Sequence, residues 1–252
     1  MRLMPATQQI VEQVERLTNR PVHIQEDASL GVLAHMRVAR GDAPLHLLRY
    51  KPMGVVPPDY LIAYQCGFVV RLFETPPSKR FDYGTDDDGR RKFNDLFSDA
   101  RFLPAVRSMA DRLLGELVTQ LRSIPIGLRV DKWLLAQYPD LIDLQARGTR
   151  AQLEQNVPAI AIGSKGLFPA KVWKANVTMN AAFAAFWSRE WNDPALVLPY
   201  KAAGLLDGGI RLLGIFDTVP SDPACDPDLV EQWAFALGMK GWYGTTPYYL
   251  ND

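Results

Sequence analysis

The chain has 252 residues, of which 48% are hydrophobic and 22% charged, and its formal net charge is +0. This composition is that of an ordinary globular protein. The balanced charge indicates neither a nucleic-acid partner nor a strongly basic one, and it leaves little self-repulsion to oppose self-association.

The cysteine content and the N-terminus predict the compartment. Cys66 and Cys225 are the two cysteines of the chain, and so few thiols form no disulfide framework, which is typical of a reducing environment. The first residues are amphipathic and charged and lack the apolar core of a signal peptide. We therefore expect a cytoplasmic protein that does not associate with a membrane.

One helix and three strands are predicted before residue 51. Apolar residues at helical spacing predict a helix over Thr7–Leu17. Short strands are predicted over Val22–Gln25, Gly31–Ala39 and Pro44–Tyr50. The last two flank the turn Arg40-Gly41-Asp42 and therefore predict an antiparallel hairpin.

The segment Pro57–Glu74 predicts a buried central helix. Pro57 and Pro58 suit the first turn, where a missing N–H is not needed, and Asp59 complements the helix dipole there. Tyr60–Val70 contains no charged residue, so this helix is apolar nearly all round, as core helices are. The apolar run is too short to cross a bilayer.

The rest of the chain is predicted to be mostly helical. Thr75–Arg91 is polar and broken by Pro and Gly, so it predicts a surface loop, in which Asp86-Asp87-Asp88 forms a solvated turn or a helix cap rather than a metal site. The predicted helices are Phe102–Leu121 (ending at Ile124–Gly127), Val130–Tyr138, Leu141–Asn156, Pro169–Trp191, Lys201–Leu206 and Pro227–Leu237, with Ile210–Phe216 as a strand or a buried helical turn.

These elements predict an α+β, mostly helical fold. Residues 1–74 would form a small N-terminal antiparallel sheet packed on the buried central helix. Residues 75–252 would form a mostly helical remainder. No linker separates the two parts, so we expect one compact unit.

The window Ala63–Arg71 reads Ala-Tyr-Gln-Cys-Gly-Phe-Val-Val-Arg. Together with the preceding strands, it resembles the AHExGHxxR helix of zinc metallopeptidases of the ImmA/IrrE type. In an HExxH helix, two histidines one turn apart bind zinc, and the glutamate polarises the zinc-bound water. The resemblance implies a zincin-like scaffold, with a third, acidic ligand on a later helix.

The chemical positions of that motif are all replaced. Tyr64 stands at the first histidine, Gln65 at the glutamate and Phe68 at the second histidine, whereas Gly67 is retained. Phenylalanine binds no zinc, the tyrosine phenol ionises near pH ~10, and glutamine accepts no proton from water. The resemblance therefore implies an inactive relative, a pseudoenzyme, without metal or cofactor. It would keep a cleft lined by the edge strand Leu45–Tyr50 and bind a protein partner.

Relatives of this type act in bacterial stress responses and on mobile elements by cleaving repressors, so the resemblance implies a regulatory role. A simpler interpretation of the same window is an ordinary core helix in an α+β protein.

A hydrolase of another chemistry is a second hypothesis. Its nucleophile would be Cys66, or its catalytic groups would be His23, His35 and His46, which fall on the three predicted strands. The apolar neighbours of Cys66 favour an inert buried thiol, and half-exposed strand histidines are common. Asp131 is the weak candidate for an acid in the cleft.

The C-terminal tail is rich in aromatic residues. Trp242, Tyr243, Tyr248 and Tyr249 lie in a Gly- and Thr-containing segment that is too polar for an ordinary core. Because tyrosine and tryptophan are enriched at interfaces, they predict a partner-binding surface. A third hypothesis follows, in which the chain is an adaptor subunit that docks on a larger assembly through this end.

Overall fold

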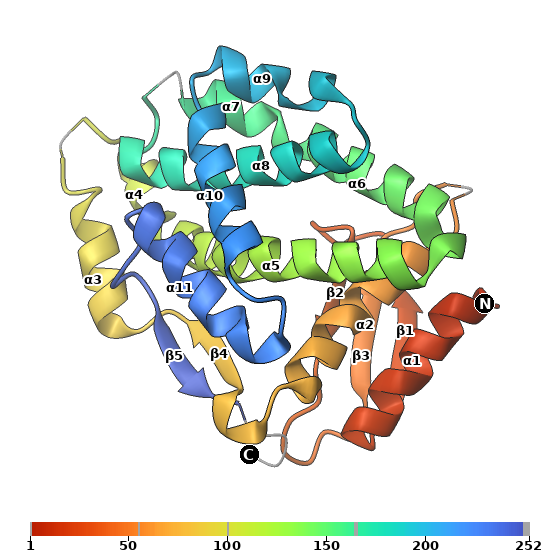
Figure 1. The fold of residues 1–252 in the computed structure, drawn as a ribbon. Helices are drawn as coiled ribbons and strands as arrows, with labels where there is room; N and C mark the ends of the chain where they lie inside the picture. The colour runs from red at the N-terminus through yellow and green to blue at the C-terminus, as the bar shows by residue number, and fades with distance from the viewer. Residues whose placement is uncertain (1, 55, 100, 164–165, 249–252) are drawn as a thin grey trace. The chain divides into compact units, whose positions relative to one another are not determined.

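The computed structural model describes residues 2–54, 56–99, 101–163 and 166–248 (Figure 1). Helices predominate beside a three-stranded and a two-stranded sheet, which confirms the predicted fold class. The elements in chain order are α1 (Pro5–Thr18), β1 (Val22–Glu26), β2 (Ala34–Arg37), β3 (His46–Tyr50), α2 (Asp59–Glu74), η1 (Pro77–Lys79), β4 (Phe81–Gly84), α3 (Asp87–Asp95), α4 (Pro104–Arg107), α5 (Ala110–Gln137), η2 (Pro139–Leu141), α6 (Ile142–Asn156), α7 (Pro158–Gly163), α8 (Ala170–Glu190), η3 (Pro194–Val197), α9 (Leu198–Ala202), α10 (Leu206–Thr218), η4 (Pro223–Cys225), α11 (Asp226–Ala236) and β5 (Gly244–Pro247).

The chain forms two compact units. The first comprises residues 1–80, 129–152 and 247–252, and the second comprises residues 81–128 and 153–246. The observed division therefore differs from the predicted one at residue 74, because residues 129–152 belong with the N-terminal sheet and helices. Helix α5 begins in the second unit and ends in the first.

Helix α5 continues through Pro125, where the sequence predicted an end at Ile124–Gly127. That prediction was wrong. Proline removes one backbone donor, but the apolar residues on both sides of it, such as Leu121 and Leu128, are fully buried and hold the helix in the core. The short helix predicted over residues 130–138 is the last part of α5.

The sheet of the first unit has the strand order β1-β3-β2. β2 and β3 pair antiparallel, which confirms the hairpin. β1 pairs with β3 in parallel, so the sheet is mixed and not the antiparallel sheet that the sequence predicted. The prediction that residues 45–50 form an edge strand was wrong, because β3 lies at the centre of the sheet. The His46 N–H donates to the Pro21 carbonyl at 2.9 Å, and the Lys51 N–H donates to the Leu33 carbonyl at 2.8 Å. The edge strands are β1 and β2.

One face of this sheet packs on α1 and α2 (Figure 1). Leu48 and Tyr50 of β3 are buried in one core with Ile10 and Val14 of α1 and Ile62 of α2. The alternate residues of the strands point to the other face, because successive side chains of a strand alternate. On that face four polar side chains are exposed, namely those of His23, Gln25, His35 and Arg37.

Helix α2 is the buried helix that the sequence predicts. Most of its side chains are buried, and Asp59 lies in its first turn. Across the described ranges, none of the helices combines the length and the apolar character that a membrane crossing requires.

Gly67 lets α2 lie close to the last part of α5. A Cβ at Gly67 would lie 2.4 Å from Cγ1 of Val130, well inside van der Waals contact. Gly67 therefore admits the Val130 side chain of a later helix.

Replacing Gly67 with Ala should destabilise the fold. Overpacking costs about 1–3 kcal/mol, and the gain in helix propensity offsets up to about 1 kcal/mol of it. We expect a net loss of about 1–2 kcal/mol in a urea unfolding curve. Gly115→Ala is the matched control, because a Cβ there meets nothing within 4 Å, and it should leave stability equal or higher. Equal stability of the Gly67→Ala variant and the wild type would contradict the close packing.

The second unit is built around α8 and α10. A Cβ at Gly209 of α10 would lie 2.7 Å from the backbone carbon of Ala181, so the two helices approach very closely. The rings of Phe186 and Phe216 meet edge to face at 5.8 Å. Residues 210–216, predicted as a strand or a buried helical turn, are helical within α10.

The segment 75–91, predicted as a surface loop, contains η1, β4 and the start of α3. That prediction was wrong because the C-terminal tail supplies β5 as the pairing partner of β4, a long-range contact that no local pattern shows. Asp86 accepts a hydrogen bond from the Gly89 N–H at 2.7 Å, which confirms the predicted helix cap.

Candidate functional site

Tyr64, Gln65 and Phe68 lie on one side of α2. The half-buried residues of this helix recur at helical spacing and form a single stripe, made of Tyr64, Gln65, Phe68, Arg71 and Leu72. Between Tyr60 and Phe73, the other α2 side chains are buried. Tyr64, Gln65 and Phe68 therefore share the least buried side of α2, where Tyr64 and Phe68 still pack against the core.

Contacts within the protein occupy these three side chains. The rings of Tyr64 and Phe68 meet edge to face at 5.2 Å, and the Tyr60 ring lies 5.7 Å from that of Tyr64. The Gln65 amide Nε2 donates to the Ala34 carbonyl of β2 at 3.3 Å. The stripe is thus an aromatic surface with one amide bound to the neighbouring edge strand.

Asp131 reaches α2 from the last part of α5 and is fully buried. Its Oδ1 accepts hydrogen bonds from the Tyr60 hydroxyl and from the Gln145 amide, both at 2.9 Å. The same amide donates to the Asp131 carbonyl at 3.1 Å. Asp131 Oδ2 and Gln145 Oε1 have no hydrogen-bond partner among the described residues. Asp131, the weak candidate for an acid in the cleft, thus contacts α2, but its burial makes it an interior acid and not an acid of an open cleft.

Burial sets the protonation of this cluster, which comprises Tyr60, Tyr64, Asp131 and Gln145. Desolvation raises the pKa of Asp131 to about 7, against the lowering effect of the hydrogen bonds from Gln145 and Tyr60. Desolvation, followed by the nearby Asp131 charge, raises the pKa of both Tyr60 and Tyr64 well above the usual value. The phenols are therefore neutral at pH 7, whereas the carboxyl group titrates near neutrality.

Sequence analysis missed Tyr60 and Gln145 as partners of Asp131. A signal for Tyr60 was its place one turn before Tyr64 on the same helix. No sequence signal indicated Gln145, because a glutamine on a polar helix is normally solvated. Gly148 makes the contact possible, since a Cβ there would lie 2.5 Å from the Tyr60 ring.

Cys66 is unsuited to nucleophilic chemistry. Its side chain is fully buried, and desolvation raises the pKa of its thiol to about 12. The reactive species is the thiolate, so a thiol that stays protonated in the core is inert.

The three strand histidines do not share one face of the sheet. His46 is buried on the inner face, where Nδ1 accepts from the Ala39 N–H at 2.9 Å and Nε2 lies 2.8 Å from the Thr18 hydroxyl. Burial lowers the pKa of His46. His23 and His35 are exposed on the opposite face. Within the described residues, no group of three or more His, Cys, Asp or Glu side chains is placed to hold a metal ion.

The tail aromatics do not form one exposed surface. Trp242 is buried against Phe93, with the rings edge to face at 5.0 Å. Tyr248 is also buried, and its ring contacts that of Phe73 at 6.0 Å. The prediction of a partner-binding surface was therefore wrong for these two, because both rings fill cores.

Of the other two tail residues, Tyr243 is half-buried and lies 5.8 Å from the Tyr83 ring. Tyr249 lies outside the described residues.

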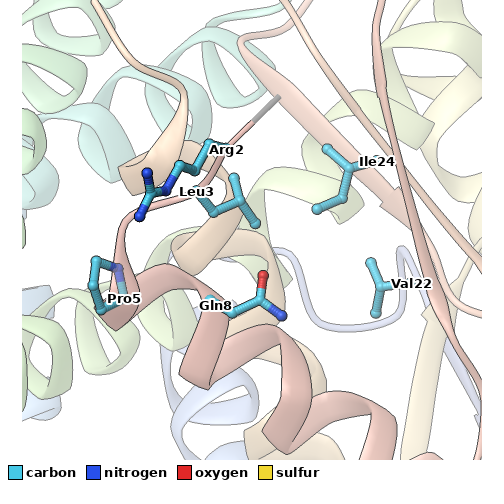
Figure 2. Close-up of a pocket in the computed structure, with 6 residues that line it drawn as sticks. All are labelled: Arg2, Leu3, Pro5, Gln8, Val22 and Ile24. Carbon is cyan, nitrogen blue, oxygen red and sulfur yellow. The ribbon is translucent and has the colours of Figure 1, made fainter.

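A groove in the first unit, which no sequence pattern indicated, lies between the start of the chain and edge strand β1. Its volume is about 660 Å³. Figure 2 shows Val22 and Ile24 of β1 on one side and residues of the N-terminal segment and α1 on the other. The residues that line it are Arg2, Leu3, Pro5, Gln8, Val22 and Ile24.

Comparison with known proteins assigns no family to this chain. No protein-family model matches it, and no curated protein or solved structure gives a significant match.

Proposed function

We propose that this chain is an inactive, metallopeptidase-like protein that binds a protein partner and serves in regulation. The observation that carries the proposal is the half-buried stripe of α2. Tyr64, Gln65 and Phe68 occupy the positions of an HExxH motif on the one side of α2 that is not fully buried. None of these side chains is a good zinc ligand or a general base at neutral pH.

Two further contacts support the scaffold. Asp131, an acid on a later helix, lies near the start of the stripe, bonded to Tyr60. Edge strand β2 lies beside the stripe, linked to it through Gln65 and Ala34. In an intact metallopeptidase of this type, a later acid and a strand beside the motif helix would serve the metal and the substrate.

The alternative hypotheses gain less support. A hydrolase built on Cys66 would need an accessible thiolate, and one built on the strand histidines would need them on one face. An adaptor that docks through its tail would need Trp242 and Tyr248 to be exposed. The structure provides none of these arrangements.

Restoring the ligands tests the scaffold directly. The variant Tyr64→His/Phe68→His places two imidazoles one turn apart, and Asp131 would serve as the third ligand by giving up its hydrogen bonds from Tyr60 and Gln145. We expect this variant to bind about one zinc ion per chain in a calorimetric titration, while the wild type binds none. Adding Asp131→Asn to the double variant should weaken zinc binding at least tenfold.

Two outcomes would count against the proposal. If the double-histidine variant remains folded by circular dichroism but binds no zinc, the stripe does not have the geometry of the motif. If the wild type itself binds zinc and cleaves a protein substrate, the chain is a peptidase and not an inactive relative.

A further inference from the structure

Strand β1 presents unpaired backbone groups along its outer edge. Residues with odd numbers direct their backbone groups to β3. The Pro21 carbonyl accepts from the His46 N–H, and the Asp27 N–H donates to the Tyr50 carbonyl, both at 2.9 Å. Successive residues of a strand direct these groups to opposite sides. The N–H and C=O of Ile24 therefore point away from the sheet, and no described strand pairs with that edge.

One donor on this edge is already satisfied within the chain. The Val22 N–H donates to the Glu15 carboxylate at 2.9 Å. The Val22 carbonyl and both backbone groups of Ile24 remain for an incoming chain. Only another extended backbone presents donors and acceptors at the matching spacing, so this edge selects a peptide strand over a compact ligand.

The groove lies beside this edge and is mainly apolar. Val22 and Ile24 form its strand wall, and Leu3 and Pro5 form part of the opposite wall (Figure 2). An incoming strand would direct every second side chain to the groove side of the sheet. The groove therefore fits apolar side chains at alternate positions.

The opposite wall is held in place by Asp59. The Met4 N–H donates to Asp59 Oδ1 at 2.7 Å, and Asp59 is buried. This bond fixes the residues before α1 across from β1. The groove is therefore formed before any ligand arrives, which lowers the entropy cost of binding.

Of the residues that line the groove, Arg2 carries a charge. It is exposed, and no described residue forms an ion pair with it. A guanidinium in this position is complementary to a carboxylate, which it binds through paired N–H donors.

The geometry points to an extended, acidic peptide segment of a partner protein that adds to β1 as a further strand. Its alternate apolar side chains enter the groove, and an Asp or Glu of the segment meets Arg2. The assignment rests on the proposed function of binding a protein partner, and it identifies the surface that binds that partner. It favours β1 over edge strand β2, where Gln65 already occupies the outward Ala34 carbonyl.

Selection from a displayed library of random 12-residue peptides on the full-length chain provides the probe. The enriched peptides should alternate apolar and polar residues and contain an acid. The best peptide is then labelled, and its affinity is measured by fluorescence anisotropy. Ile24→Pro, which removes an outward N–H without breaking the bonds to β3, should weaken binding at least tenfold. Met36→Pro, the matched change on β2, should change it less than threefold.

A second pair of variants changes exposed charges only, and it distinguishes a loss of peptide binding from misfolding. Arg2→Glu reverses an exposed charge in the groove and should weaken binding at least fivefold, whereas Arg37→Glu on the exposed sheet face should not. Enrichment of no peptide, or a loss with Met36→Pro and not with Ile24→Pro, would overturn the assignment. A dimer in solution that Ile24→Pro dissociates would identify a second copy of the chain as the occupant and also overturn it. None of these results depends on whether the wild type binds zinc, so failure here is distinguishable from failure of the proposed function.

Discussion

Replacing Asp131 with Asn should remove a large part of the pH dependence of stability. Burial raises the pKa of this carboxyl group from 3.8 to about 7 in the folded chain. The folded state therefore holds the proton more tightly than the unfolded state does. The stabilisation from this proton is complete below pH 3.8 and is lost as the pH rises through 7, because the buried carboxylate is costly.

The expected size of the effect is large. Each unit of pKa difference corresponds to about 1.4 kcal/mol, so between pH 5 and pH 8 the wild type should lose roughly 2–3 kcal/mol through Asp131 alone. Asn keeps the shape and an acceptor for Tyr60 and Gln145 but carries no charge at either pH. Urea unfolding of both proteins at pH 5 and pH 8 measures the difference.

Asp140→Asn is the control for this measurement, because Asp140 is exposed in the same unit. It should leave the pH dependence like that of the wild type. A wild type and an Asp131→Asn variant that lose the same stability between pH 5 and pH 8 would show that Asp131 is not buried as described.

Replacing Trp242 with Ala should destabilise the second unit by about 3–5 kcal/mol, the usual cost of removing a buried tryptophan. The ring is 3% exposed and meets Phe93 edge to face. Lys171 Nζ lies 5.0 Å from its centroid. The chain segment at Trp242 also lies tightly against α3, since a Cβ at Gly89 would fall 2.6 Å from the Trp242 carbonyl oxygen.

Phe235→Ala is the matched aromatic control. Phe235 lies on α11 in the same unit, and its side chain is 74% exposed. Its removal should change the unfolding free energy by less than about 0.5 kcal/mol. Comparable losses in the two variants would restore the earlier interpretation of Trp242 as a surface residue.

Local patterns predicted the elements that depend on local forces. The run without charges in α2 and the helical spacing in α1 correspond to helices in the structure. The alternation around His35 gives β2 its exposed and half-buried sides. These features depend on period and burial, which a single sequence contains.

Long-range contacts determined where the predictions went wrong. β4 needed β5 from the far end of the chain, and β3 became central because β1 pairs with it. Pro125 did not end α5, because buried neighbours outweighed the lost hydrogen bond. For the strands, the deciding partner is remote in sequence.

The candidate site was predictable only in part. The sequence indicated the window from Tyr64 to Phe68 and the acid Asp131 as candidates. In the structure, Asp131 lies at the start of α2, where it accepts a hydrogen bond from the Tyr60 hydroxyl. Gln145 and the groove at β1 could not be predicted. They depend on how α6 packs on α2 and on the bond that holds Met4 to Asp59.

The most direct test of the inactive-scaffold proposal is the zinc content of the wild-type chain. Purified protein is incubated with excess zinc, passed through a desalting column and analysed for metal by elemental analysis. Because Tyr64, Gln65 and Phe68 supply no zinc ligand of the motif, we predict far less than one zinc ion per chain. One tightly held zinc ion per chain, retained after Tyr64→Phe and lost on substitution of His23 or His35, would contradict the account.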